Sequence, residues 1–139
     1  MSYELLIEET RKFFALHWPK NEELPAPEWS GLWTFCGSIY NYDKGGCYTL
    51  FAGDSLIYVG VSENNIAART NNYTRMAPGA RSISVESRPY EPSKPWRSKG
   101  LNGIRTLGFP EKYIYLAPAL ESLLIARLQP KENVAKKCT

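Results

Sequence analysis

Two short strand-like runs joined by a turn constrain the fold of this chain more than any other part of its sequence. Residues 47–52 and 56–60 are rich in aromatic and β-branched side chains, and the Gly-Asp-Ser loop between them has the composition that closes a β-hairpin. Alternate side chains of a strand face the same side of a sheet, so Tyr48 and Tyr58 each lie on one definite face. Whether that face is shared depends on the strand register. Ordinary cross-strand packing accounts for both rings on these residues alone.

The length and composition predict one soluble globular domain. The chain has 139 residues, of which 43% are hydrophobic and 22% charged. No apolar run approaches the roughly 20 residues that cross a membrane, and glutamates stand where a signal peptide would be basic. The cysteines are odd in number and widely spaced, which favours a reducing, cytoplasmic setting over a disulfide framework. They are Cys36, Cys47 and Cys138.

The charges are distributed unevenly along the chain. Residues 1–45 contain four basic and seven acidic side chains, whereas residues 46–139 contain thirteen basic and seven acidic ones. A basic body behind an acidic N-terminal part is compatible with a polyanionic partner.

Residues 1–45 are expected to form an N-terminal helix and an aromatic, proline-rich extension packed on a domain of residues 46–139. Apolar side chains recur at helical spacing over residues 3–17, and Pro19 ends the run. The only histidine, His17, is better explained by the helix dipole at this C-terminus than as a catalytic base. The aromatic residues of 29–45 indicate core packing, with stacking on bases as the alternative.

A short helix is predicted after the hairpin, within residues 62–73, with Ser62 as its N-cap. Arg69 and Tyr73 are four residues apart and therefore lie on the same side of such a helix.

Residues 75–112 form a long segment with little periodicity and an excess of basic side chains, interleaved with Trp96. Either it is a solvated surface loop or it faces phosphates, and the mixture of basic and aromatic residues favours the second interpretation. Residues 81–88 alternate enough to predict a short edge strand. The candidate phosphate contacts in this segment are Arg81, Arg97 and Lys99.

A third strand is predicted at residues 112–116, followed by a largely apolar helix that begins near Pro118 and is terminated by Pro130. Glu121 lies near the start of that helix, where it is either a helix-dipole residue or a metal-binding carboxylate. Together these elements predict an α+β fold: a small three-stranded, mostly antiparallel sheet flanked by helices, with an extra helix at the N-terminus.

The ordered set of these residues resembles the GIY-YIG endonuclease superfamily over most of residues 46–133. Gly46-Cys47-Tyr48 is similar to the first triplet of that family and Tyr58-Val59-Gly60 to the second. Further along the chain, the residues that match the family pattern are Arg69, Tyr73, Glu121, Leu128, Pro130 and Asn133. The chain departs from the pattern at Cys47, and at Val61, where several relatives have a lysine thought to help activate a tyrosine.

The resemblance implies a Mg²⁺- or Mn²⁺-dependent endonuclease that hydrolyses phosphodiester bonds in DNA. Arg69 would neutralise phosphate oxygens and Glu121 would hold a single divalent ion. Tyr48, supported by Tyr58, would act as general base or orient the attacking water. Tyr73 and Asn133 would orient the substrate or hold Glu121.

Two other classes of function remain open at this point. One is a nucleic-acid-binding module that has lost turnover, which Val61 favours. The other is a structural or protein-binding domain, which the full set of charged site residues disfavours. The sequence leaves undecided whether the nucleic acid is DNA or RNA, and whether the chain is a monomer or a homodimer.

Overall fold

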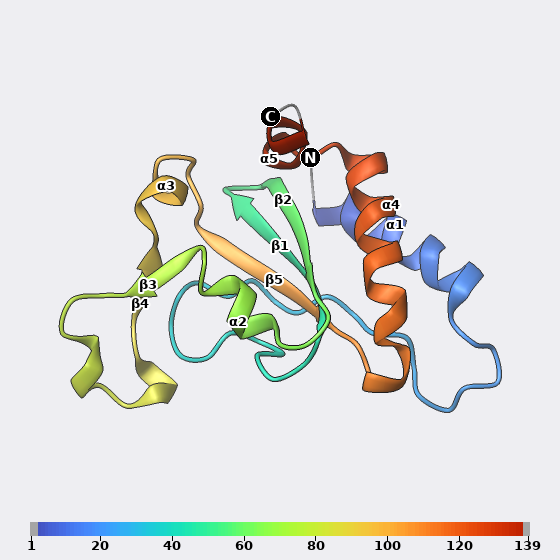
Figure 1. Ribbon diagram of the computed structural model, residues 1–139, viewed down its shortest axis with the longest axis horizontal. Coiled ribbons are helices and arrows are strands. Elements are labelled where there is room, and N and C mark those ends of the chain that lie inside the picture. Colours follow the sequence, from blue (N-terminus) through green and yellow to red (C-terminus); the bar gives the residue numbers. More distant parts are fainter. Residues whose placement is uncertain (1–2, 138–139) are drawn as a thin grey trace.

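A three-stranded antiparallel sheet forms the centre of the structure, a computed structural model that describes residues 3–137 (Figure 1). Strand β1 (Gly46–Ala52) lies in the middle and pairs on one side with β2 (Ser55–Ser62) and on the other with β5 (Gly103–Gly108). The prediction of a mixed α+β fold with a three-stranded antiparallel sheet is thereby confirmed.

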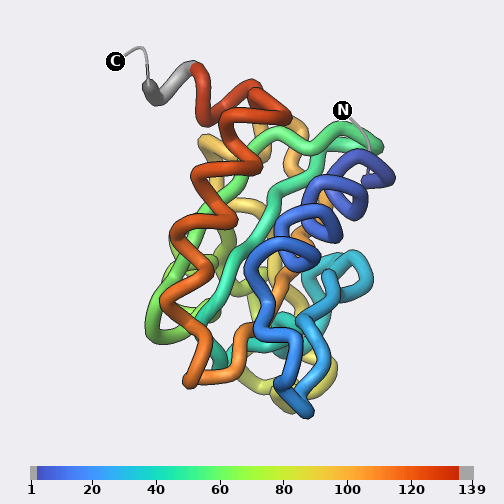
Figure 2. Tube along the Cα trace, turned by 90° about the vertical axis from the view of Figure 1, so that its right-hand side faces the viewer, coloured from blue at the N-terminus to red at the C-terminus, as the bar shows by residue number. Residues whose placement is uncertain are grey.

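Helices cover both faces of this sheet. The long helices α1 (Tyr3–His17) and α4 (Ala117–Leu128) lie side by side over one face, as both views show (Figures 1 and 2). Helix α2 (Ile66–Thr70) lies over the other face. The remaining elements are β3 (Thr74–Met76), the 3₁₀ turns η1 (Ala80–Ser82) and η2 (Val85–Ser87), β4 (Tyr90–Pro92), α3 (Lys94–Arg97), the 3₁₀ helix η3 (Glu111–Leu116) and α5 (Lys131–Lys137).

The hairpin has the register that brings Tyr48 and Tyr58 to one face. Tyr48 is opposite Gly60, and Leu50 is opposite Tyr58. Because Tyr48 and Leu50 are two residues apart in one strand, Tyr48 and Tyr58 share a face. Their ring centroids are 6.5 Å apart. The turn is the two-residue Gly53-Asp54, with φ of +63° at the glycine.

The N-terminal extension shares the core of the sheet. Leu6 and Phe13 of α1 are buried in the same cluster as β1 and α4. Further along, the extension runs beside the outer edge of β5: the Ser30 amide donates to the Thr106 carbonyl at 2.8 Å, and Trp33 exchanges backbone hydrogen bonds with Ile104.

The third strand is not where the sequence predicted it. Residues 112–116 belong to the 3₁₀ helix η3, in which the Tyr113 amide donates to the Pro110 carbonyl and Tyr115 is exposed. The third strand is β5. It was not predicted because it begins and ends with glycine, a residue that is uncommon in strands. Gly103 and Gly108 are needed there because added Cβ atoms would lie 2.5 Å from Leu32 and 2.7 Å from Asn41.

Two local predictions are also wrong. Residues 81–88 do not form an edge strand but parts of η1 and η2, since almost nothing in this segment is buried and an alternating face would have no core to meet. Helix α2 is shorter than expected, and its N-cap is Asn65, whose side chain accepts from the Ala68 amide. Ser62 instead is the last residue of β2, and its hydroxyl oxygen accepts a hydrogen bond from the Asn65 backbone N–H at 3.0 Å.

The helices of the described part of the chain include none that is long and apolar enough to cross a lipid bilayer. Cys36 and Cys47 are free thiols, and Cys138 lies outside the described residues.

Candidate functional site

Three tyrosine rings meet on the α2 side of the sheet. Tyr48 comes from β1, Tyr58 from β2, and Tyr73 from the turn between α2 and β3. The ring of Tyr73 lies 5.6 Å from that of Tyr48 and 5.9 Å from that of Tyr58, and the hydroxyls of Tyr48 and Tyr73 are hydrogen-bonded at 2.8 Å. We call these three residues the tyrosine cluster.

Gly60 explains how Tyr48 fits into the cluster. A Cβ at this position would lie 2.3 Å from the Tyr48 ring and 2.4 Å from its hydroxyl. The ring therefore lies directly across the backbone of the opposite strand, and only glycine leaves room for it. Gly60, the last residue of the Tyr58-Val59-Gly60 triplet, is therefore required because a larger side chain would clash with Tyr48.

The tyrosine cluster is buried. Tyr48 is 0% exposed, and Tyr58 and Tyr73 are 7% and 8% exposed. Burial raises the pKa of Tyr48, an effect that its hydrogen bond with Tyr73 and the nearby Arg69 charge only partly offset. Burial and the neighbouring phenols also raise the pKa of Tyr73. Both phenols are therefore neutral at pH 7.

Arg69 lies between the buried tyrosine cluster and the solvent. It lies on α2, whose first turn is capped by Asn65, and its side chain is exposed. Hydrogen bonding to the Tyr48 hydroxyl raises the pKa of the guanidinium, which is charged at all ordinary pH values in any case. The outcome is a fixed positive charge beside a neutral, buried phenol pair.

Helix α3 covers the outer side of the tyrosine cluster, through a residue that the sequence did not identify as a site residue. The ring of Trp96 meets Tyr58 and Tyr73 edge-on, with centroids 5.8 and 5.1 Å away. The Ser93 amide at the start of α3 donates to the Tyr73 carbonyl at 2.8 Å. The alternation of basic and aromatic residues was the only sequence signal for Trp96, and it could not show which ring would pack here.

The structure places two of the three predicted phosphate contacts of the 75–112 segment at or just after α3 and the third on η1. Lys99 lies 4.3 Å from the Trp96 ring centroid and forms an ion pair with Glu132 at 3.1 Å. Arg97 pairs with Glu91 at 3.2 Å. Arg81 is exposed on η1. Arg97 and Lys99 therefore have carboxylate partners within the chain.

Asn133, predicted to orient the substrate or hold Glu121, bonds to the backbone of β2. Its amide oxygen accepts from the Val59 backbone N–H at 2.8 Å, and its amide nitrogen donates to the Val59 carbonyl at 3.0 Å. Because β2 is an edge strand, this pair of bonds satisfies backbone groups that no neighbouring strand reaches, and it holds α5 against the sheet.

Glu121 belongs to α4, which covers the face of the sheet opposite the tyrosine cluster. It lies beside Cys47: burial, and to a smaller extent the Glu121 carboxylate, raises the pKa of the Cys47 thiol. Side chains of consecutive strand residues point to opposite faces, so Cys47 and Tyr48 face away from each other. Glu121 therefore approaches β1 from the α4 side and is half-buried.

A divalent ion at Glu121 fits only one mode of binding. The described residues contain no group of three or more histidine, cysteine, aspartate or glutamate side chains that could enclose a metal. A single half-buried carboxylate suits Mg²⁺, which keeps most of its waters and takes substrate phosphate oxygens as further ligands. Mg²⁺ fits this donor set and a fully protein-enclosed metal does not.

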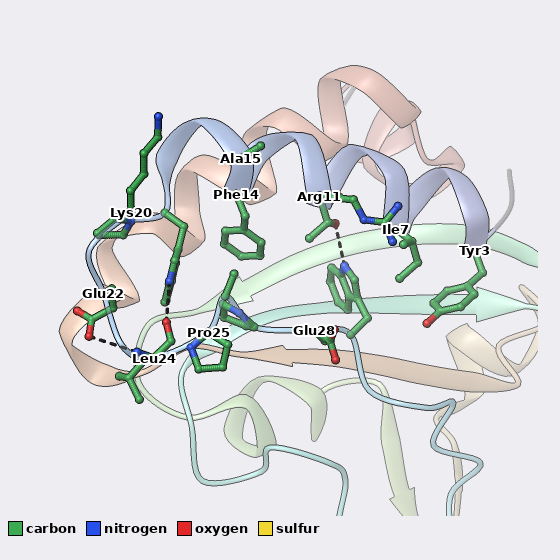
Figure 3. Close-up of a pocket in the computed structure, with 16 residues that line it drawn as sticks. Tyr3, Ile7, Arg11, Phe14, Ala15, Lys20, Glu22, Leu24, Pro25 and Glu28 are labelled. Atoms are coloured by element: carbon green, nitrogen blue, oxygen red, sulfur yellow. Dashed lines mark hydrogen bonds between the residues drawn. The ribbon is translucent and has the colours of Figure 1, made fainter.

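A large cavity lies away from the tyrosine cluster. It has a volume of about 730 Å³ and runs between α1 and residues 18–29, with Phe14 and Pro25 facing each other across it and Arg11 and Glu28 at its rim (Figure 3). The Trp29 indole N–H donates to the Thr10 hydroxyl at 2.8 Å, and this bond links the 18–29 segment to α1. The cavity contains none of the predicted site residues.

No protein-family model, curated protein or solved structure matches this chain. The similarity to the GIY-YIG superfamily therefore stays a prediction that depends on the residues described above.

Proposed function

We propose that the protein is a Mg²⁺-dependent endonuclease of the GIY-YIG type that hydrolyses phosphodiester bonds in DNA. The observation that carries this proposal is the meeting of Tyr48, Tyr58 and Tyr73 beside the exposed Arg69 guanidinium. The Tyr48 and Tyr73 hydroxyls are paired with each other, and the exposed Arg69 charge beside them is the group that a phosphate would meet.

Arg69 is the substrate-binding group in this mechanism. Its planar fork donates to two phosphate oxygens and neutralises the charge that grows on the phosphate in the transition state. Tyr48, a neutral phenol that is itself hydrogen-bonded to Tyr73, holds the fork in place. The pKa of Tyr48 is raised by burial, so we assign it a positioning role in place of the general-base role.

The family resemblance assigns the divalent ion to Glu121, which α4 carries on the face of the sheet opposite Arg69 and the tyrosine cluster. A Mg²⁺ ion held there would supply Lewis-acid chemistry. The Glu121→Gln variant below therefore tests the ion assignment separately from the tyrosine face.

Plasmid nicking tests the proposal. Purified protein with Mg²⁺ should nick supercoiled DNA, and Arg69→Ala and Glu121→Gln should each lower the rate by about 10²–10³-fold or more, as expected when a charged transition-state contact is removed. Arg11→Ala and Glu111→Gln are matched controls, because both side chains are exposed and distant from the tyrosine cluster. Wild-type rates in both site variants would contradict the site, and no cutting with Mg²⁺ or Mn²⁺ would contradict the function.

The second candidate is a nucleic-acid-binding module without turnover. The full burial of Tyr48 favours it, because a phenol that is neutral and 0% exposed cannot itself deprotonate a water. This candidate predicts DNA binding with a steep salt dependence and no metal-dependent cleavage during long incubation.

A further inference from the structure

A second, smaller cavity lies beside α2, on the opposite side of that helix from Arg69. Its volume is about 220 Å³, below the roughly 300–1,000 Å³ of typical small-molecule pockets, so it suits a single flat ring system. The lining residues used below are Trp33, Tyr42, Ala67, Thr70, Asn71 and Tyr90.

Helix geometry relates this cavity to the tyrosine cluster. Ala67, Thr70 and Asn71 follow i, i+3, i+4 spacing and therefore lie on one side of α2. Arg69 is two residues from Ala67, about 200° around the helix. A strand whose phosphate binds Arg69 would thus present a neighbouring nucleotide, and not the bound one, to the cavity.

Three aromatic side chains contribute to the lining of the cavity: Trp33, Tyr42 and Tyr90. Trp33 is 6% exposed and its indole N–H is already bonded to the Cys36 carbonyl, so it offers ring surface and no donor. Tyr90 packs 5.9 Å from Trp33, and Tyr42 is 51% exposed at the entrance. Ring faces of this kind stack on bases of any sequence.

Asn71 adds a polar group to these walls. Its side-chain amide is exposed and has no hydrogen-bond partner in the part of the chain that the structure describes. An amide presents one acceptor and one NH₂ donor group side by side, which matches the hydrogen-bonding edges of nucleobases.

We propose that this cavity is a subsite for one unpaired base of the nucleic-acid substrate, stacked on Tyr42 and hydrogen-bonded by the amide of Asn71. The inference rests on the proposed function, since it assumes a nucleic-acid substrate. It adds a structural preference: the protein recognises DNA that can place an unpaired base next to the phosphate bound at Arg69. Paired bases are stacked within the duplex and cannot enter.

Binding without cleavage tests the subsite. Two fluorescent probes are compared by anisotropy in EDTA: a paired duplex, and the same duplex with a single-nucleotide bulge. Wild-type protein should bind the bulged probe about tenfold more tightly or better, in line with the contribution of a stacked base. Tyr42→Ala and Asn71→Ala should each remove most of that preference and leave the affinity for the paired probe unchanged.

Two control variants are closely matched. Tyr40 is 50% exposed in the same loop as Tyr42 but does not line the cavity, and Asn72 is the exposed neighbour of Asn71. Tyr40→Ala and Asn72→Ala should keep the full preference for the bulged probe. Loss of the preference in these controls as well would show a general surface effect and overturn the subsite.

The remaining outcomes separate the two proposals. Equal binding of both probes by the wild type, or an unchanged preference in Tyr42→Ala and Asn71→Ala, overturns the subsite and leaves the endonuclease proposal standing. Binding of neither probe by the wild type contradicts the nucleic-acid function itself and the subsite with it.

Discussion

The two faces of the central sheet are built on different principles. The face under α1 and α4 is a cluster of aliphatic and phenylalanine side chains covered by two long helices. The opposite face buries three tyrosines under short elements: the five-residue α2, the three-residue strands β3 and β4, and the four-residue α3, in which no residue is fully buried.

The contrast indicates that the two faces contribute differently to stability. Apolar packing under long helices is where the free energy of unfolding arises, because burial of apolar surface is the dominant stabilising term. Hydroxyl groups add little net stability and must be paired. Short covering elements with few buried contacts open more readily than long ones, which would suit the substrate-binding role that we propose for this face.

The largest expected effect lies on the α1 and α4 face. Leu6→Ala should lower the free energy of unfolding by roughly 2–5 kcal/mol, because Leu6 is 0% exposed and its loss leaves a cavity. Leu16→Ala, on the same helix but 80% exposed, should change it by less than about 0.5 kcal/mol. Urea denaturation compares the two. Equal small effects would show that α1 is not part of the core.

The next effect lies at Gly60, on the tyrosine face. Gly60→Ala should destabilise the protein by roughly 1–3 kcal/mol, because the new methyl group clashes with the Tyr48 ring, which has no free space to move into. The control is Gly31→Ala, since an added Cβ there meets nothing within 4 Å. Near-UV circular dichroism should change in Gly60→Ala, and an unchanged spectrum and stability would contradict the register.

A smaller effect tests whether the buried hydroxyls act as a pair. Tyr73→Phe removes the partner of the Tyr48 hydroxyl and should cost about 1–2 kcal/mol. The double variant Tyr48→Phe/Tyr73→Phe should cost less than the sum of the two single changes, because neither hydroxyl of this pair then remains without the other. Thermal unfolding of all four proteins completes the double-mutant cycle, and strict additivity would rule out coupling through this bond.

The smallest effect lies far from both faces and depends on pH. Glu22 accepts hydrogen bonds from Tyr113 and Lys112, which lower its pKa to about 2 from its ordinary 4.5. A lowered folded-state pKa means that this contribution is complete above pH 4.5 and is lost as the pH falls towards 2. Glu22→Gln should therefore flatten the dependence of the melting temperature on pH between about 5 and 2. An identical acid profile in both proteins would contradict the contact.

Several elements were predictable because their signals are local. The apolar spacing of residues 3–17 predicted α1 with its observed ends, and the hairpin was readable from β-forming runs around a glycine turn. Pro118 and Pro130 correctly marked the limits of α4. Each of these signals depends on residues within a few positions of one another.

The errors arose where a distant contact decided the local structure. The β5 strand has glycines at both ends and forms because β1 and the 30–33 segment pair with its two edges. Residues 112–116 carry a strand-like alternation but turn into a 3₁₀ helix that leads into α4. Strand preference depends on such neighbours more than helix preference does.

The sequence alone determined which residues are available for chemistry: the tyrosines, Arg69, Glu121 and Asn133, in a recognisable order. Only the tertiary structure decided their state. The register of β1 against β2 buried Tyr48 across Gly60, α3 brought Trp96 over the cluster, and the edge of β2 engaged Asn133. The reason is physical: identity and spacing are written along the chain, whereas burial, pairing and pKa depend on side chains that folding brings from far away.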